Sequence, residues 1–146
     1  MDTFQQLYCD LVCLHDKVHT YHIRTVNKEW CATIHSTLGT IYQWLEENVD
    51  SFGENIITKY MWDTVSSTQE CYDNSGFIVA DSIDPEEIIE ELYDDVDVME
   101  TRLGEALNKA NNQLAQLMWP IREDFTDYCA ALKKEMKWIE KETDKD

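Results

Sequence analysis

The chain has 146 residues, a length typical of one domain. It carries 30 Asp and Glu against 12 Lys and Arg, so its formal net charge is −18. Such a surface repels nucleic acid and anionic membranes and attracts cations. Four Gly and two Pro are too few for the tight turns of a β-sandwich or β-barrel. We therefore expect a single all-α domain that spans residues 1–146.

The sequence also bears on compartment and processing. It has no basic segment followed by an apolar run at its start, and no stretch approaches the ~20 apolar residues of a membrane span. Its five scattered Cys, an odd number, do not match a disulfide framework. These features predict a soluble protein of a reducing cytoplasm, in which Cys9 and Cys13 are buried thiols rather than metal ligands.

Two amphipathic helices are expected in the first half of the chain, at about residues 3–27 and 29–61. Apolar side chains recur in both at spacings of three and four. The stripes are Leu7, Leu11, Leu14, Val18 and Tyr21 in the first helix and Ile34, Leu38, Ile41, Leu45 and Val49 in the second. A further stripe of the first helix is Tyr8, Val12, His15, His19 and His22. The short link between the helices predicts that they lie antiparallel.

Residues from about 63 to 82 interrupt the helical pattern with turn-forming Ser, Thr, Asn, Asp and Gly. A segment of this length can cross the whole bundle and can hold a short helix. A four-helix bundle requires such a crossover when its second and third helices run parallel.

Two more helices are expected after this segment. The third covers about residues 85–111, with Asp84 as the N-cap and Pro85 in the first turn. The fourth covers about residues 119–141, with Pro120 in its first turn. Within the third helix, the acidic run 94–97 is expected to face solvent or a cavity.

Four residues of the first two expected helices suggest a metal site: His22, His35, Asp50 and Glu54. The two acids are four residues apart and share a helix face, and imidazole with carboxylate suits iron. His35 and Asp50, however, are about 22 Å apart on one continuous helix, whereas a ligand lies roughly 2 Å from its metal. Either they are unrelated, or the His of one subunit meet the acids of another across a two-fold axis, which creates two equivalent sites.

The sequence also lacks any Glu-x-x-His pair, the pattern of a di-iron centre built inside one subunit. The residues that are present resemble another group, the Dps-like miniferritins of the ferritin-like superfamily. There a Tyr-His pair ends the first helix, a second His follows, an Asp comes fifteen residues later and a Glu four further on. Here these positions are Tyr21-His22, His35, Asp50 and Glu54, with one more residue between the two His.

The resemblance covers most of the chain and implies a ferritin-like four-helix bundle with a long crossover between helices 2 and 3. Twelve such subunits would form a shell. It implies ferroxidase centres at the two-fold interfaces, made by His22, His35, Asp50 and Glu54. There ferrous iron would be oxidised, usually by hydrogen peroxide, and stored as ferric mineral inside the shell. This reaction removes iron and peroxide together and so protects against oxidative stress.

Acidic residues at the start of the expected fourth helix also have family counterparts. They are candidates for a three-fold iron-entry pore, namely Glu123, Asp124 and Asp127. The alternative is a solvated first turn that the helix dipole favours. His15 and His19 have a two-imidazole spacing, but the resemblance supplies no ligands there, so we expect surface or interface roles for them.

Two departures from the family keep other functions open. Gly39 stands where an acidic residue is often found four positions after the second His, and Ile23 replaces the Trp after the first. A Dps-like assembly or interaction protein with a degraded centre is therefore one alternative. The net charge suggests another, an acidic helical DNA mimic that inhibits a nucleic-acid enzyme. DNA binding itself is not expected, because neither terminus carries clustered cations.

Overall fold

A computed structural model describes residues 2–26, 32–60 and 65–144. Four long helices form a bundle, and a short helix lies in the segment between the second and third of them. The helices are α1 (Thr3–Arg24), α2 (Ala32–Tyr60), α3 (Thr68–Asn74), α4 (Pro85–Leu107) and α5 (Asn112–Asp144). No strand occurs in these ranges, which confirms the all-α prediction. In the same ranges no helix is long and apolar enough to cross a membrane.

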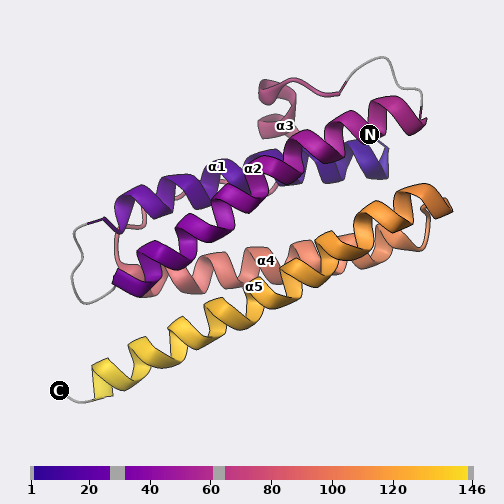
Figure 1. The fold of residues 1–146 in the computed structure, drawn as a ribbon. Helices are drawn as coiled ribbons and strands as arrows, with labels where there is room; N and C mark the ends of the chain where they lie inside the picture. Colours follow the sequence, from indigo (N-terminus) through magenta and orange to yellow (C-terminus); the bar gives the residue numbers. More distant parts are fainter. Residues whose placement is uncertain (1, 27–31, 61–64, 145–146) are drawn as a thin grey trace.

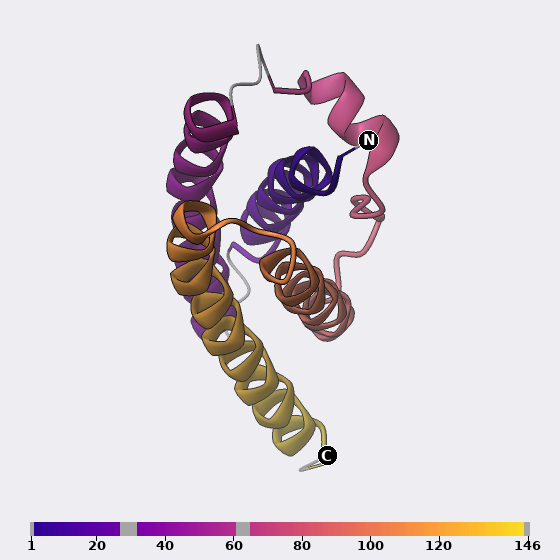
Figure 2. The ribbon, with the colours of Figure 1, turned by 90° about the vertical axis from the view of Figure 1, so that its right-hand side faces the viewer.

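The bundle consists of two packed pairs, α1 with α2 and α4 with α5, joined by contacts of α2 with α5 and of α1 with α4 (Figures 1 and 2). In Figure 1, α2 and α4 run in the same direction, while α1 and α5 run the opposite way. The predicted stripes meet in the core. Its fully buried members include Leu11, Leu14 and Tyr21 of α1, Ile34, Leu38 and Leu45 of α2, Ile88, Leu92 and Val96 of α4, and Leu114, Met118 and Phe125 of α5.

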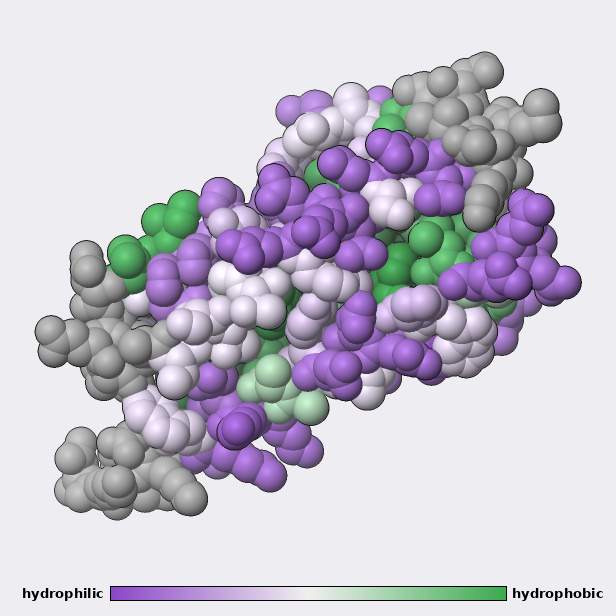
Figure 3. All heavy atoms as spheres, viewed as in Figure 1, coloured by the Kyte–Doolittle hydropathy of each residue, from purple (hydrophilic) through white to green (hydrophobic). Residues whose placement is uncertain are grey.

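Figure 3 shows one face of this bundle. Hydrophilic residues cover most of it, and apolar residues show only in separate patches. The excess of Asp and Glu in the sequence accounts for this surface, because charged side chains stay in water unless they are paired.

The buried thiols agree with the sequence. Cys9, Cys13 and Cys71 are free and buried, and Cys129 is half-buried. Burial raises the pKa of the Cys13 thiol to about 11, so this residue stays protonated at neutral pH. Cys31 lies outside the described residues.

The helix starts show one prediction confirmed and one wrong. The Asp84 side chain accepts a hydrogen bond from the amide of Glu86 at 2.9 Å, and Pro85 follows it, as expected. The last helix begins at Asn112 rather than near 119, and Pro120 lies inside it. The helix begins earlier because Asn111 caps it: the Asn111 side chain accepts a hydrogen bond from the backbone amide of Leu114 at 2.9 Å.

Residues 75–84, which we call the strap, connect α3 to α4 along the outside of α1. Near the start of α1, Gln6 Nε2 donates to the Asn74 carbonyl at 2.8 Å. Near its end, the Arg24 guanidinium donates to the carbonyls of Ala80 at 2.6 Å and Ser82 at 2.9 Å. Gln6 and Arg24 are about 27 Å apart along a helix, so the segment after Asn74 returns along most of the length of α1.

A buried lysine joins α1 to α4. Lys17 Nζ lies 2.7 Å from Glu91 Oε1 and 2.6 Å from Asp95 Oδ2, and the Lys17 side chain is only 4% exposed. The Tyr21 hydroxyl donates to Glu91 as well. The expectation that the acidic run 94–97 faces solvent or a cavity is therefore wrong for Asp95, which pairs with the buried Lys17.

A second ionic pair joins the same two helices with the charges exchanged. Asp10, which is fully buried, lies 2.9 Å from the Arg102 guanidinium and accepts from the Ser75 hydroxyl at 3.1 Å. From Asp10 to Lys17, α1 advances seven residues, and from Arg102 to Asp95, α4 goes back by seven. The two pairs therefore set the register of α1 against α4, because a slip of either helix separates both.

Candidate metal centre

The structure brings His22 of α1 and His35 of α2 together. Their rings stack with centroids 3.9 Å apart and planes 15° apart. Each Nδ1 lies 2.8 Å from the other residue's backbone carbonyl. A carbonyl oxygen can only accept, so both Nδ1 atoms carry the proton. The lone pair of each neutral ring is then on Nε2, the atom that can bind a metal.

This hydrogen-bond pattern is typical of metal-binding histidines, which usually donate their other ring N–H to a carbonyl or a carboxylate. Burial lowers the pKa of His22 and outweighs its hydrogen bond with the His35 backbone, and the neighbouring rings of His35 and His19 lower it further. His22 therefore favours the neutral imidazole, which is the form that coordinates metal ions.

Gly39 makes room for this arrangement. A Cβ atom at position 39 would stand 2.9 Å from Cε1 of His22 and 3.3 Å from its Nδ1. Any side chain there, including the acidic one that the resemblance leads us to expect, would therefore push against the imidazole. The departure at Gly39 removes a carboxylate from the site and lets the ring pack against the helix backbone.

The two predicted acids lie far from this pair in the same chain. Asp50 and Glu54 are exposed near the other end of α2. His35 and Asp50 are about 22 Å apart along that helix. Close to the acids, a Cβ at Gly53 would stand 2.9 Å from the ring of Tyr8. Among the described residues, no group of three or more His, Cys, Asp or Glu side chains is placed to hold one metal ion.

All four histidines lie along the seam between α1 and α2, together with Tyr42. Centroid distances to the Tyr42 ring are 4.6 Å from His19, 5.1 Å from His22 and 6.1 Å from His15. We call His15, His19, His22 and His35 the histidine row. All four are half-buried, and His15, His19 and His22 belong to the predicted second stripe of the first helix.

The three candidate pore residues lie in the middle of α5 and not in a first turn, because that helix begins at Asn112. Glu123 and Asp127 are exposed, and Asp124 is half-buried. The alternative, that these acids form a first turn favoured by the helix dipole, is therefore wrong. Burial, followed by the charges of Asp124 and Asp127, raises the pKa of the neighbouring Tyr128.

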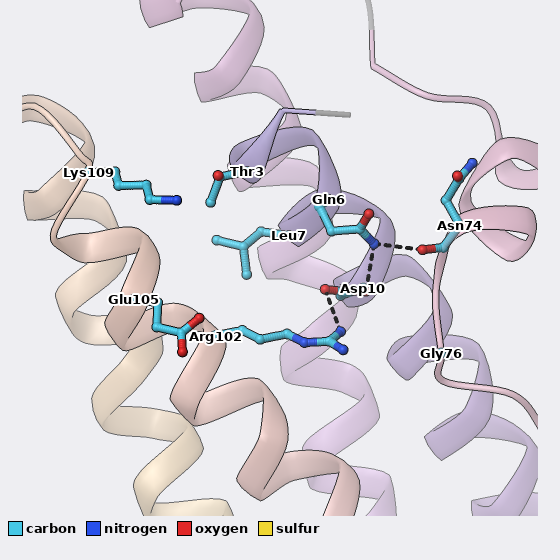
Figure 4. A pocket seen from close by; sticks show the side chains of 9 residues that line it. All are labelled: Thr3, Gln6, Leu7, Asp10, Asn74, Gly76, Arg102, Glu105 and Lys109. Atoms are coloured by element: carbon cyan, nitrogen blue, oxygen red, sulfur yellow. Dashed lines mark hydrogen bonds and ion pairs between the residues drawn. The ribbon is translucent and has the colours of Figure 1, made fainter.

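A polar pocket of about 450 Å³, which was not among the predicted sites, lies between α1, α4 and the strap (Figure 4). The Asp10–Arg102 pair lies on its wall, and Glu105 and Lys109 approach from α4 and the turn after it. A signal was present, because Asp10 and Lys17 stand three residues after Leu7 and Leu14 and so lie beside the predicted apolar stripe. Charges of opposite sign at core positions indicate buried partners on a neighbouring helix.

Comparisons with known proteins add no assignment. The resemblance stated above depends on four residues, of which His22 and His35 meet in one chain while Asp50 and Glu54 lie apart from them. No protein-family model, no curated protein and no solved structure matches the chain.

Proposed function

We propose that this chain is a ferritin-like protein that binds ferrous iron as its substrate and oxidises it at centres shared by two subunits. The observation that supports this most is the pair His22 and His35, whose reciprocal hydrogen bonds leave both Nε2 atoms unprotonated. The parallel course of α2 and α4, with the strap returning along α1, supports a ferritin-like topology with its long crossover.

In the proposed centre, two imidazoles come from one subunit and two carboxylates, Asp50 and Glu54, from a second. The stacked rings, with centroids 3.9 Å apart, are too close for both to bind one ion, so each imidazole holds a different one of two ferrous ions. A two-fold axis that sets two α2 helices antiparallel brings the histidine end of one onto the acidic end of the other. Both acids are exposed on the single chain and so are accessible to a partner subunit. Imidazole and carboxylate ligands suit ferrous iron and leave positions open for an oxidant.

The chemistry balances with hydrogen peroxide as the oxidant. Two ferrous ions each lose one electron, the O–O bond of one peroxide breaks, and two protons complete two water molecules. The ferric ions then hydrolyse to mineral in the cavity of a shell, which we propose to contain twelve subunits. The net charge of −18 favours iron uptake, and Glu123, Asp124 and Asp127 are candidates for its entry route.

The test combines kinetics and mass. Ferrous iron is added without oxygen, hydrogen peroxide follows, and the ferric absorbance is recorded for the wild type and for the His35→Ala, Asp50→Ala double variant. We expect fast oxidation by the wild type only, and a light-scattering mass near twelve times that of the 17.2 kDa chain. Equal rates for the two proteins would contradict the proposal.

The same measurements separate the alternatives. A shell that forms but binds no iron indicates an assembly or interaction protein with a degraded centre, as Gly39 and Ile23 suggest. A monomer or dimer that inhibits a nuclease indicates a DNA mimic.

A further inference from the structure

We propose that His15 and His19 form a second metal site, for a divalent ion of the late first transition row such as Cu²⁺ or Zn²⁺. The two residues are four apart on α1, so their side chains leave the same face of the helix. Their rings lie with centroids 6.2 Å apart and planes 26° apart. This site goes beyond the proposed iron centre and does not depend on it.

The hydrogen bonding of His15 is the first argument. Its Nδ1 lies 3.1 Å from Asp16 Oδ1, and a carboxylate oxygen accepts, so Nδ1 carries the proton. Its Nε2 is buried and, among the residues that the structure describes, has no hydrogen-bond partner. A buried polar atom without a partner costs free energy, and a bound cation would supply the missing partner.

Asp16 is itself held in place. The hydroxyl of Tyr72 on α3 donates to Asp16 Oδ2, while Oδ1 holds the His15 ring. A carboxylate that fixes the tautomer of an imidazole and raises its basicity is the usual support of a metal-binding histidine. The chain Tyr72–Asp16–His15 therefore orients the Nε2 lone pair before any ion arrives.

The separation of the rings fits one shared ion. An imidazole nitrogen binds its metal at about 2.1 Å, so the ring centre lies about 3.2 Å from the ion. Two rings on one ion then have centroids about 5.2 to 6.4 Å apart, from the tetrahedral to the linear arrangement. The observed 6.2 Å lies near the linear end of this range.

The ring of Tyr42 separates this site from the proposed iron centre, because it lies 4.6 Å from the ring of His19 and 5.1 Å from that of His22. The ligands differ as well. Two imidazoles completed by water favour Cu²⁺ and Zn²⁺ over Fe²⁺, in the usual order of divalent affinities. The histidine row therefore holds two sites of different metal preference.

The test removes the other histidine pair first. In a His22→Gln, His35→Gln background, only His15 and His19 carry imidazole. Cu²⁺ is titrated into this protein by calorimetry, and electron paramagnetic resonance counts the coordinated nitrogens. We expect one Cu²⁺ per chain with two nitrogen ligands. A protein that keeps its helical circular dichroism but binds no Cu²⁺ overturns the proposal.

Two further variants in the same background complete the test. His15→Gln should weaken Cu²⁺ binding by at least about tenfold, and Asp16→Asn, which keeps both imidazoles, by about 10- to 100-fold. Unchanged affinity in both overturns the site. In the otherwise unmodified chain, Asp16→Asn is expected to leave iron oxidation at its wild-type rate. Intact Cu²⁺ binding without iron oxidation would contradict only the iron centre. Iron oxidation without Cu²⁺ binding would contradict only the His15–His19 site.

Discussion

Gly39 and Gly53 lie on α2, and each is closely approached by a side chain of α1. We predict that Gly39→Ala displaces the ring of His22, because the new Cβ would stand 2.9 Å from its Cε1. Steric cost is partly offset, since Ala is more helix-favouring than Gly by about 1 kcal/mol. The sensitive measurement is therefore the imidazole NMR spectrum, in which the signals of His22 and His35 should both shift.

Gly53→Ala is the matched control for this prediction. Its Cβ would meet the ring of Tyr8 at the same 2.9 Å. This substitution should therefore disturb Tyr8 and leave both histidine signals unchanged. If the two variants gave the same histidine spectrum, Gly39 would have no specific part in positioning His22.

We predict that loss of Lys17 strongly destabilises the bundle. In Lys17→Met, Glu91 and Asp95 lose their cation inside the α1–α4 contact. Removing one partner of a buried ion pair costs about 3–5 kcal/mol, because the remaining charge is left uncompensated. Urea denaturation measures this free energy of unfolding.

The control is Lys109→Met, which makes the same chemical change at an exposed residue. It should alter the free energy of unfolding by no more than about 0.5 kcal/mol. A Lys17→Met protein as stable as this control would show that the buried pairs contribute little.

Glu91 makes the stability of the bundle depend on pH. Burial raises the pKa of Glu91, but hydrogen bonds from Lys17 and Tyr21 outweigh burial and hold it below its ordinary value of 4.5. A lowered folded-state pKa gives stability that is complete above the unfolded value and is lost as the pH falls through the folded one. The free-energy gap between wild type and Glu91→Gln should therefore narrow from about pH 4.5 downward.

Comparison with Glu91→Gln is needed because Asp95 acts in the opposite direction. Burial raises the pKa of Asp95 and outweighs its hydrogen bond to Lys17, so its ionisation disfavours folding as the pH rises. Asp95 is present in both proteins, so the difference removes the part of its contribution that does not depend on the charge of Glu91. A gap that stayed constant through the acidic range would contradict the assignment to Glu91.

At the scale of the element, one residue at the start of α5 stabilises the helix and another destabilises it. Pro120 has no backbone N–H and lies inside the helix, where Pro is about 3 kcal/mol less favourable than Ala. Asn111 caps the same helix. We predict that Pro120→Ala raises the free energy of unfolding by about 1–3 kcal/mol and that Asn111→Ala lowers it by about 1 kcal/mol. Thermal unfolding of the two variants should shift in opposite directions, and shifts in the same direction would contradict this account.

The same helix shows what sequence patterns can and cannot predict about elements. Periodicity predicted the four long helices and their buried faces, because apolar spacing directly reflects which side of a helix is covered. Pro120 predicts too late a start for α5, because the buried Leu114 and Met118 extend the helix to the N-terminal side of the proline. The sequence predicts a short helix in the crossover without its bounds. The capping box of Ser67 and Glu70 marks where α3 begins.

At the scale of the whole molecule, the sequence predicted that the acids lie far from His35, because helical rise alone fixes a distance along one helix. It did not predict the reciprocal hydrogen bonds of His22 and His35, which depend on how α1 and α2 pack. Nor did it predict the Lys17 and Asp10 pairs, since their partners are more than 70 residues away. Side-chain contacts between helices could therefore not be predicted from the sequence.

A centre shared by two subunits makes a prediction that a centre within one subunit does not. Take one variant without the histidines, His22→Gln, His35→Gln, and another without the acids, Asp50→Asn, Glu54→Gln. Each alone should be inactive. When they are refolded together in equal amounts, half of the two-fold pairs are mixed, and each mixed pair contains one complete site and one site with no ligands.

The mixture should therefore recover about a quarter of the wild-type rate of iron oxidation per subunit, whereas mixing the separately folded proteins without subunit exchange should recover none. Recovery requires that histidines and acids from different chains meet, so a centre contained in one chain would give no activity in either mixture. Because stability and assembly of both variants can be checked by mass before mixing, an inactive co-refolded shell of the correct size would contradict the intersubunit centre.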